Sequence, residues 1–210
     1  MTNLRAWGRA LAIFAALLVA CVLLVSCSVE PKLEIEGKKQ DFEAMSRETL
    51  EGYVTVGDYK DMEISLDGAS KEDALWQRIL ENVHVREYPQ EHVYYYIDQL
   101  EGQYRYYAEQ ADISYKEMLE QLGQSDATIL HEAKNLTKKD MAYALIVKLE
   151  GISLTDGEKD AYFDRYVDKY VENYGYSEDY VKSNMSELIY DSMLYDKTTE
   201  FLILNNAFSE

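Results

Sequence analysis

The chain has 210 residues, and its 39 acidic side chains outnumber the 21 basic ones, which gives a formal net charge of −18 at pH 7. Nucleic acid is therefore an unexpected partner, because binding it depends on basic residues that neutralise phosphates. The only cysteines, Cys21 and Cys27, lie near the N-terminus, so the rest of the chain can hold neither a disulfide framework nor a cysteine metal site.

The N-terminal part has the layout of a secretory signal. Arg5 and Arg9 precede an uncharged stretch over residues 10–26. The stretch ends in LVSC, which resembles the lipobox of bacterial lipoproteins and implies that residues 1–26 are a cleaved signal peptide and that Cys27 carries the lipid. A retained transmembrane anchor is the alternative, since the stretch is at the short end of the roughly 17 to 25 residues that span a bilayer.

Residues 27–45 are predicted to be the lipidated cysteine and a flexible tether, because they are polar and contain Pro31, Gly37 and paired lysines. Residues 46–210 are predicted to form one domain. Its negative charge repels an anionic membrane surface, so we expect the domain to stand off the bilayer on the extracytoplasmic face.

The domain begins with a pattern typical of strands and then becomes helical. Residues 53–66 alternate apolar and polar side chains around Gly57, which predicts short extended segments at a turn. Ser70, with Asp73 three residues later, predicts a helix start. Pro89 is expected as the first residue of a longer helix, where its missing N–H has no partner to lose.

The next two helices have clear end signals. Ser114 with Glu117 forms a capping box that starts a short helix. A longer helix is predicted over residues 125–150, with Gly151 as its left-handed end. The polar middle of this helix leaves a break near Asn135 open.

The C-terminal part repeats these signals. Thr155 with Glu158 predicts another capping box, and Gly175 ends the helix that follows. Ser177 begins a last helix that is long enough to require a kink or several packing neighbours. The sequence thus predicts a mostly α fold with a short N-terminal extended, β-like segment.

The order of these segments resembles that of a known family. Three runs carry the resemblance: VGDYKDMEISL, LWQRILENVHVREYPQEHVYYYIDQL and LTDGEKDAYFDRYVDKYVENYGYSEDYVKSNMSELIYDSMLYDKTTEFLILNNA. Residues 53–207 resemble the C-terminal chaperone domain of bacterial trigger factor, whose helical fold is shared by SurA-type foldases. The first run looks like the family's GDYKGLEV segment, and none of the three runs is catalytic.

The departures from that family shape the expected function. Trigger factor has a prolyl isomerase domain where this chain has only residues 67–74, which are too few to form a folded unit. The ribosome-binding domain is replaced by the signal and the tether. The resemblance therefore implies a membrane-tethered holdase that binds unfolded or nascent exported polypeptides and is not an enzyme. A scaffold lipoprotein that docks one partner and a foldase with residual isomerase activity are the alternatives.

Tyrosines on the helix after Pro89 are the candidate peptide-binding residues. Consecutive helical residues point about 100° apart, so the rings cannot all face a core. We expect Tyr94, Tyr95, Tyr106 and Tyr107 to contribute to a binding surface, although tyrosine at helical spacing is more often part of a core. Acidic surroundings would favour clients with basic stretches.

Catalytic and metal chemistry find little support in the sequence. His84, His92 and His131 have no spacing that places two of them on one helical turn, and neither an HExxH nor a G-x-S-x-G motif occurs. Paired carboxylates are too common in so acidic a chain to be informative. No catalytic residue, metal or cofactor is therefore expected.

Overall fold

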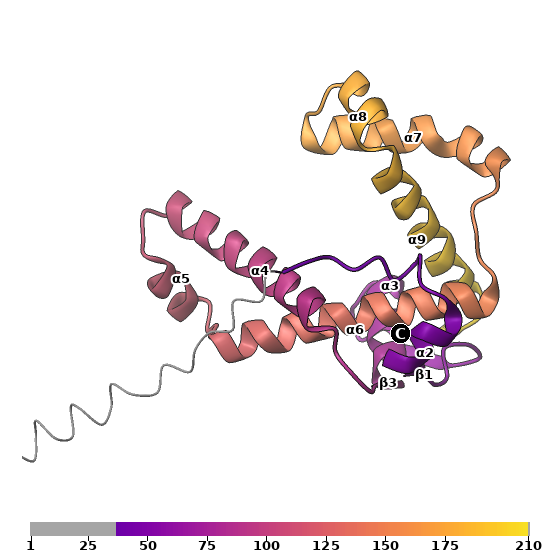
Figure 1. Ribbon diagram of the computed structural model, residues 1–210, viewed down its shortest axis with the longest axis horizontal. Helices are drawn as coiled ribbons and strands as arrows, with labels where there is room; N and C mark the ends of the chain where they lie inside the picture. The colour runs from indigo at the N-terminus through magenta and orange to yellow at the C-terminus, as the bar shows by residue number, and fades with distance from the viewer. Residues whose placement is uncertain (1–36, 210) are drawn as a thin grey trace, which may run out of the picture. The chain divides into compact units, whose positions relative to one another are not determined.

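The computed structural model describes residues 37–209 (Figure 1). The predicted signal peptide, residues 1–26, the lipid-attachment residue Cys27 and residues 28–36 of the predicted tether lie outside the described residues. Within the described part, no helix combines the length and the hydropathy needed to cross a bilayer.

The described residues form eight helices and four short strands, so the predicted mostly α fold is confirmed. The helices are α2 (Arg47–Tyr53), α3 (Lys71–Glu81), α4 (Gln90–Gln110), α5 (Tyr115–Gln121), α6 (Asp126–Glu150), α7 (Asp156–Tyr174), α8 (Glu178–Asn184) and α9 (Ser186–Leu204). The strands are β1 (Val54–Val56), β2 (Glu63–Ser65), β3 (Val83–Val85) and β4 (Ala207–Ser209).

The extended segments predicted within residues 53–66 are present as β1 and β2, but they do not pair with each other. β1 pairs antiparallel with β3, with Val54 opposite Val85. β2 pairs in parallel with β4, with Ile64 opposite Phe208. A parallel pair requires a long connection, and here the connection contains the helices from α3 to α9. The sequence did not reveal β3 and β4, because three-residue strands are too short to show an alternating pattern.

Most of the predicted helix ends are confirmed. The Ser70 side chain accepts a hydrogen bond from the Asp73 N–H, and both predicted capping boxes form, at Ser114 and at Thr155. Gly151 and Gly175 adopt the left-handed conformation, with φ of 63° and 71°. Pro89 precedes α4 as its N-cap instead of being its first residue.

Two long helices resolve the questions that the sequence left open. α6 is continuous through Asn135, and the buried Thr137 hydroxyl donates to the Ala133 carbonyl within the helix (2.8 Å). The predicted last helix is interrupted at Met185, which separates α8 from α9. A kink, one of the two expected solutions, is therefore what the structure shows.

The main core forms around the second half of α6. Residues 141–147 are all buried, and α6 contacts α2, α3, α4, β1 and β3. Other fully buried members of this core are Leu50, Leu75, Ile79 and Leu202. A second, smaller core joins α7, α8 and α9 through Tyr166, Val167, Val181, Ile189 and Met193. α9 thus contributes to both cores.

The described end of the predicted tether is packed against the domain. The Lys38 N–H donates to the Glu91 carbonyl (2.9 Å), and Phe42 is buried in the main core beside the His92 ring, with centroids 4.7 Å apart. The predicted boundary between tether and domain, at residue 46, therefore lies within folded structure. This packing could not be predicted, because one apolar residue, Phe42, in a polar run produces no periodic pattern.

Candidate functional site

The tyrosines predicted on α4 fall at its two ends. Tyr106 and Tyr107 lie near the C-terminal end with 57% and 44% of their surface exposed, and their ring centroids are 6.0 Å apart. Tyr94 and Tyr95 are half-buried near the N-terminal end. Twelve residues of helix separate the two pairs by about 18 Å, so the structure does not gather the four into one site.

Tyr94 and Tyr95 lie beside the N-terminal segment. A Cβ atom at Gly37 would approach the Tyr95 amide nitrogen to 2.6 Å, so the backbone of Gly37 lies directly against α4. The Tyr95 ring packs near the rings of His92 and Tyr96, with centroids 5.9 and 5.3 Å away. These contacts give Tyr95 a packing role in addition to its exposed part.

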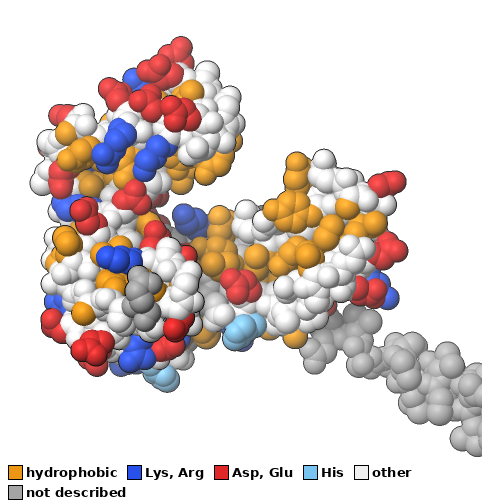
Figure 2. Space-filling model, turned by 180° about the vertical axis from the view of Figure 1, so that it is seen from behind, with side chains coloured by type: hydrophobic (Ala, Val, Ile, Leu, Met, Phe, Trp, Pro, Cys, Tyr) orange, Lys and Arg blue, Asp and Glu red, His pale blue; other side chains and the backbone are white. Residues whose placement is uncertain are grey.

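The Tyr106–Tyr107 pair has other exposed apolar side chains in its part of the chain. Leu122 follows α5 and Leu130 lies near the start of α6, and both are exposed. α5 and α6 both contact α4. Figure 2 shows hydrophobic side chains gathered over this α4–α5 part of the molecule. This surface has the character expected of a site for apolar segments of other chains.

A second aromatic surface was not singled out from the sequence. Neighbouring rings follow one another from α7 into α8, with centroid distances of 5.5, 6.3 and 5.5 Å along the series. We call this series the tyrosine row; its members are Tyr170, Tyr174, Tyr176 and Tyr180. The last three are exposed by 67%, 44% and 49%. The spacing of tyrosines by four along α7 was visible in the sequence, but not the continuation of the series across Gly175.

A hollow of about 860 Å³ lies where the N-terminal segment, α4, α6 and α9 meet. We call it the acidic hollow because carboxylates outnumber lysines in its lining. Its charged lining residues are Asp41, Glu43, Asp140, Glu187, Asp191, Asp196, Lys39 and Lys139. No sequence pattern predicts this hollow, because its walls come from segments far apart in the chain.

One wall of the acidic hollow is aromatic. The Tyr195 ring stacks on the Trp76 ring at 6.0 Å, and the Tyr143 ring lies 5.5 Å from the Tyr195 ring. The Lys139 ammonium lies over the rings of Trp76 and Tyr195, at 5.1 and 5.3 Å from their centroids. The wall therefore already holds one cation by cation–π attraction.

A buried hydrogen-bonded network supports another part of the hollow. The Gln40 N–H donates to His92 Nδ1 (2.9 Å), so the proton of a neutral imidazole resides on Nε2, which donates to Asp140 Oδ2 (2.9 Å). The Tyr96 hydroxyl donates to the same oxygen (2.6 Å). Burial and the Asp140 charge raise the pKa of Tyr96. Because both ring nitrogens of the fully buried His92 are engaged, this network fixes structure and offers no base to a substrate.

The remaining carboxylates of the hollow repel one another. Partial burial, followed by the charges of Asp191 and Asp41, raises the pKa of Glu43. Burial also raises the pKa of Asp191; Lys39 opposes this rise, and Asp41 and Glu187 add to it. The hollow is therefore poised to accept a positive charge.

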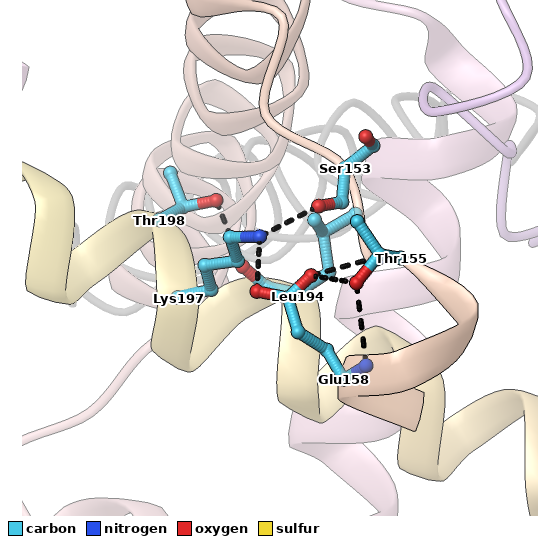
Figure 3. Close-up of polar contacts among 6 residues, drawn as sticks. All are labelled: Ser153, Thr155, Glu158, Leu194, Lys197 and Thr198. Atoms are coloured by element: carbon cyan, nitrogen blue, oxygen red, sulfur yellow. Dashed lines mark hydrogen bonds and ion pairs between the residues drawn. The ribbon is translucent and has the colours of Figure 1, made fainter. Parts of the chain in front are cut away.

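Polar contacts fix the start of α7 against α9 (Figure 3). The Lys197 ammonium donates to the Ser153 carbonyl (2.8 Å) and to the Glu158 carboxylate, which also accepts hydrogen bonds from the N–H and hydroxyl of Thr155. The hydrogen bond from Lys197, with those from Thr155, lowers the pKa of Glu158 to about 2. These contacts connect α7 to α9, and α9 supplies one side of the acidic hollow.

The three histidines differ in their exposure to solvent. His84 and His131 are exposed, and His92 is buried in the network described above. Over residues 37–209, no three metal-ligating side chains lie close enough together to hold an ion.

No family model, curated protein or solved structure matches the chain. The resemblance to the trigger factor chaperone domain thus remains a prediction from the sequence runs that carry it.

Proposed function

We propose that the protein is a membrane-tethered, extracytoplasmic chaperone that holds unfolded or translocating polypeptides without covalent chemistry. The observation that carries the proposal is the exposure of large aromatic side chains. Over residues 37–209, tyrosines make up most of the large apolar residues that stay exposed: Tyr106, Tyr107, Tyr162, Tyr174, Tyr176 and Tyr180. Exposed apolar side chains that gather into patches mark interaction sites.

Tyrosine suits a surface that must accept many sequences. Its ring offers a large apolar area with little rotamer entropy to lose, and its hydroxyl can donate or accept a hydrogen bond. The exposed rings occur in two places, at the Tyr106–Tyr107 pair and along the tyrosine row. Separate apolar surfaces favour extended, variable clients over one dedicated partner.

The remaining parts of the proposal come from the sequence. The mostly helical fold agrees with a relationship to the trigger factor chaperone domain, which we propose on the three sequence runs. On the basis of the lipobox-like LVSC, we propose that the protein is attached to the membrane by a lipid on Cys27, a residue that lies outside the described part of the chain. The anchor would hold the binding surfaces near chains that emerge from the membrane.

Suppression of client aggregation tests the proposal. The full-length protein, in nanodiscs of neutral lipid, would be mixed with several chemically unfolded clients while light scattering is followed. We expect suppression by the wild type. The double variant Tyr106→Ser/Tyr107→Ser should require about tenfold more protein, which corresponds to a loss of about 1.4 kcal/mol in binding.

The control variant is Leu204→Ser, which removes the most exposed of the large apolar side chains, 77% exposed, outside both aromatic surfaces. It should suppress aggregation as the wild type does. Absence of suppression for every client would contradict the proposal and favour a scaffold that docks a single partner.

A further inference from the structure

Apart from Asp41, which accepts a hydrogen bond from the Ala44 N–H (2.9 Å), the carboxylates of the acidic hollow divide into two groups. Asp140 is engaged by His92 and Tyr96, and Asp196 accepts a hydrogen bond from the Tyr166 hydroxyl and lies 3.7 Å from the Lys169 ammonium. These two are satisfied within the protein. They hold the walls of the hollow in place.

The second group has no such partners. In the part of the chain that the structure describes, no hydrogen bond or ion pair reaches the carboxylates of Glu43, Glu187 and Asp191. Lys39 lies near enough to lower the pKa of Asp191 but makes no ion pair with it, and Lys139 is placed over aromatic rings. The hollow therefore contains negative charge that its own lysines do not neutralise.

Tyr143 provides an independent sign of a missing ligand. Its side chain lines the hollow and is only 8% exposed, yet its hydroxyl has no hydrogen-bond partner among the described residues. The Thr198 hydroxyl lies close by but donates to the Leu194 carbonyl (2.8 Å). A buried hydroxyl without a partner costs about 1–3 kcal/mol. A donor that enters the hollow would remove that cost.

The surroundings of the Tyr143 hydroxyl define what can enter. Glu43 and Asp191 line the same hollow as Tyr143, and after burial their charges contribute to raising the pKa of Tyr143. The Tyr195 ring, which lies beside the Tyr143 ring, already has the Lys139 ammonium over its face, so the aromatic wall of the hollow is compatible with a cation. An anionic group would be repelled, and a purely apolar one would desolvate carboxylates without compensation.

We propose that the acidic hollow binds the ammonium or guanidinium group of a lysine or arginine side chain from the bound polypeptide. The cation lies between Glu43 and Asp191 and donates hydrogen bonds to their carboxylates and to the Tyr143 hydroxyl. Such charge-assisted hydrogen bonds are about twice as strong as neutral ones. This inference rests on the proposed function and names the class of client segment, a cationic one, that the hollow selects.

A pair of isosteric peptides tests the inference. One unfolded, tyrosine-containing peptide has a single arginine, and the other has neutral citrulline in its place. Binding of each to the full-length protein in neutral-lipid nanodiscs would be measured by fluorescence anisotropy. We expect the arginine peptide to bind about tenfold more tightly, the equivalent of about 1.4 kcal/mol.

The variants Asp191→Asn and Glu43→Gln should abolish this preference, and Tyr143→Phe should reduce it. Asp160→Asn is the control, because it removes an exposed carboxylate of α7 that does not line the hollow. The raised pKa of Asp191 means that its negative charge opposes folding at neutral pH. Asp191→Asn should therefore not lower the urea midpoint, which separates lost binding from lost folding.

The outcomes distinguish this inference from the proposed function. Equal binding of the two peptides, or a preference that survives both carboxamide variants, would overturn the cation site while polypeptide binding stands. Failure of both peptides to bind would overturn both proposals. Free arginine amide that binds as tightly as the arginine peptide would overturn the polypeptide as the source of the cation.

Discussion

His92 connects the N-terminal segment to the helices. Its Nδ1 accepts from the Gln40 N–H, its Nε2 donates to Asp140, and its ring lies against Phe42. One side chain thus ties the segment that borders the acidic hollow to both α4 and α6. This arrangement explains how residues near 40, polar in sequence, become part of the folded domain.

The variant His92→Phe tests this role. It keeps an aromatic ring but leaves the Gln40 N–H without its partner, so we expect a loss of about 1–3 kcal/mol in the free energy of unfolding, measured by urea denaturation. His131→Phe changes an exposed histidine of α6 and should stay within about 0.5 kcal/mol of the wild type. Equal effects of the two variants would show that the hydrogen bonds of His92 contribute little.

At the scale of the elements, glycine conformation decides where a helix ends. Gly151 has φ of 63° and ends α6, whereas Gly102 lies inside α4 with open space around it. Gly151→Ala should therefore destabilise the protein by about 1–2 kcal/mol, since a side chain disfavours the left-handed region. Gly102→Ala should stabilise it by about 0.5–1 kcal/mol, because alanine is the better helix former.

The free energy of unfolding of Gly151→Ala and of Gly102→Ala, each relative to the wild type, would be measured by thermal or urea denaturation. The same chemical change is expected to have opposite signs at the two positions. A shift of the same sign at both would contradict the assigned end of α6 or the continuity of α4.

The contact of α7 with α9 should depend on pH. The pKa of Glu158 is lowered from its ordinary value of 4.5 to about 2, chiefly by the hydrogen bond from Lys197. A lowered pKa means that the ionised carboxylate stabilises the folded state above pH 4.5, and that this stabilisation is lost as the pH falls toward 2. Glu158→Gln should thus be less stable than the wild type at neutral pH, with the difference in urea midpoint vanishing as the pH approaches 2.

The control for this prediction is Asp160→Asn, two residues along α7 and exposed. Its difference from the wild type should stay small across the same range. A Glu158→Gln difference that is constant with pH would contradict the role of the Lys197 contact.

The sequence predicted helix ends better than strands for a local reason. The capping boxes at Ser114 and Thr155 involve residues three positions apart, so the sequence contains the whole interaction. The pairing of β2 with β4 joins residues more than a hundred positions apart, and each strand has only three residues. The break at Met185 was foreseen only as one of two ways to accommodate a long apolar run.

The candidate site shows the same contrast. Helical geometry predicts that some of the adjacent rings on α4 are exposed, because they cannot all face one core, but not which of them; the structure exposes Tyr106 and Tyr107. The role of Tyr143 could not be predicted, because its surroundings include Glu43 from the N-terminal segment and Asp191 from α9. Those residues meet only in the folded chain.

For the whole molecule, surface and charge act together. The net charge of −18 opposes self-association through the exposed tyrosines, because like-charged copies repel one another. Under the proposed chaperone function, the same charge would attract basic segments, which aromatic contacts would then bind. Affinity for unfolded chains should consequently fall as salt is added, but it should not vanish, since the aromatic contacts are insensitive to screening.

The most direct test of the central claim compares the unfolded and native forms of one client. The client is reduced, blocked with neutral carbamidomethyl groups to stay unfolded, and titrated against the full-length protein in neutral-lipid nanodiscs by fluorescence anisotropy. The proposed chaperone function predicts saturable binding of the unfolded form and none of the native form. Failure to bind the unfolded form, or equal binding of both forms, would contradict it.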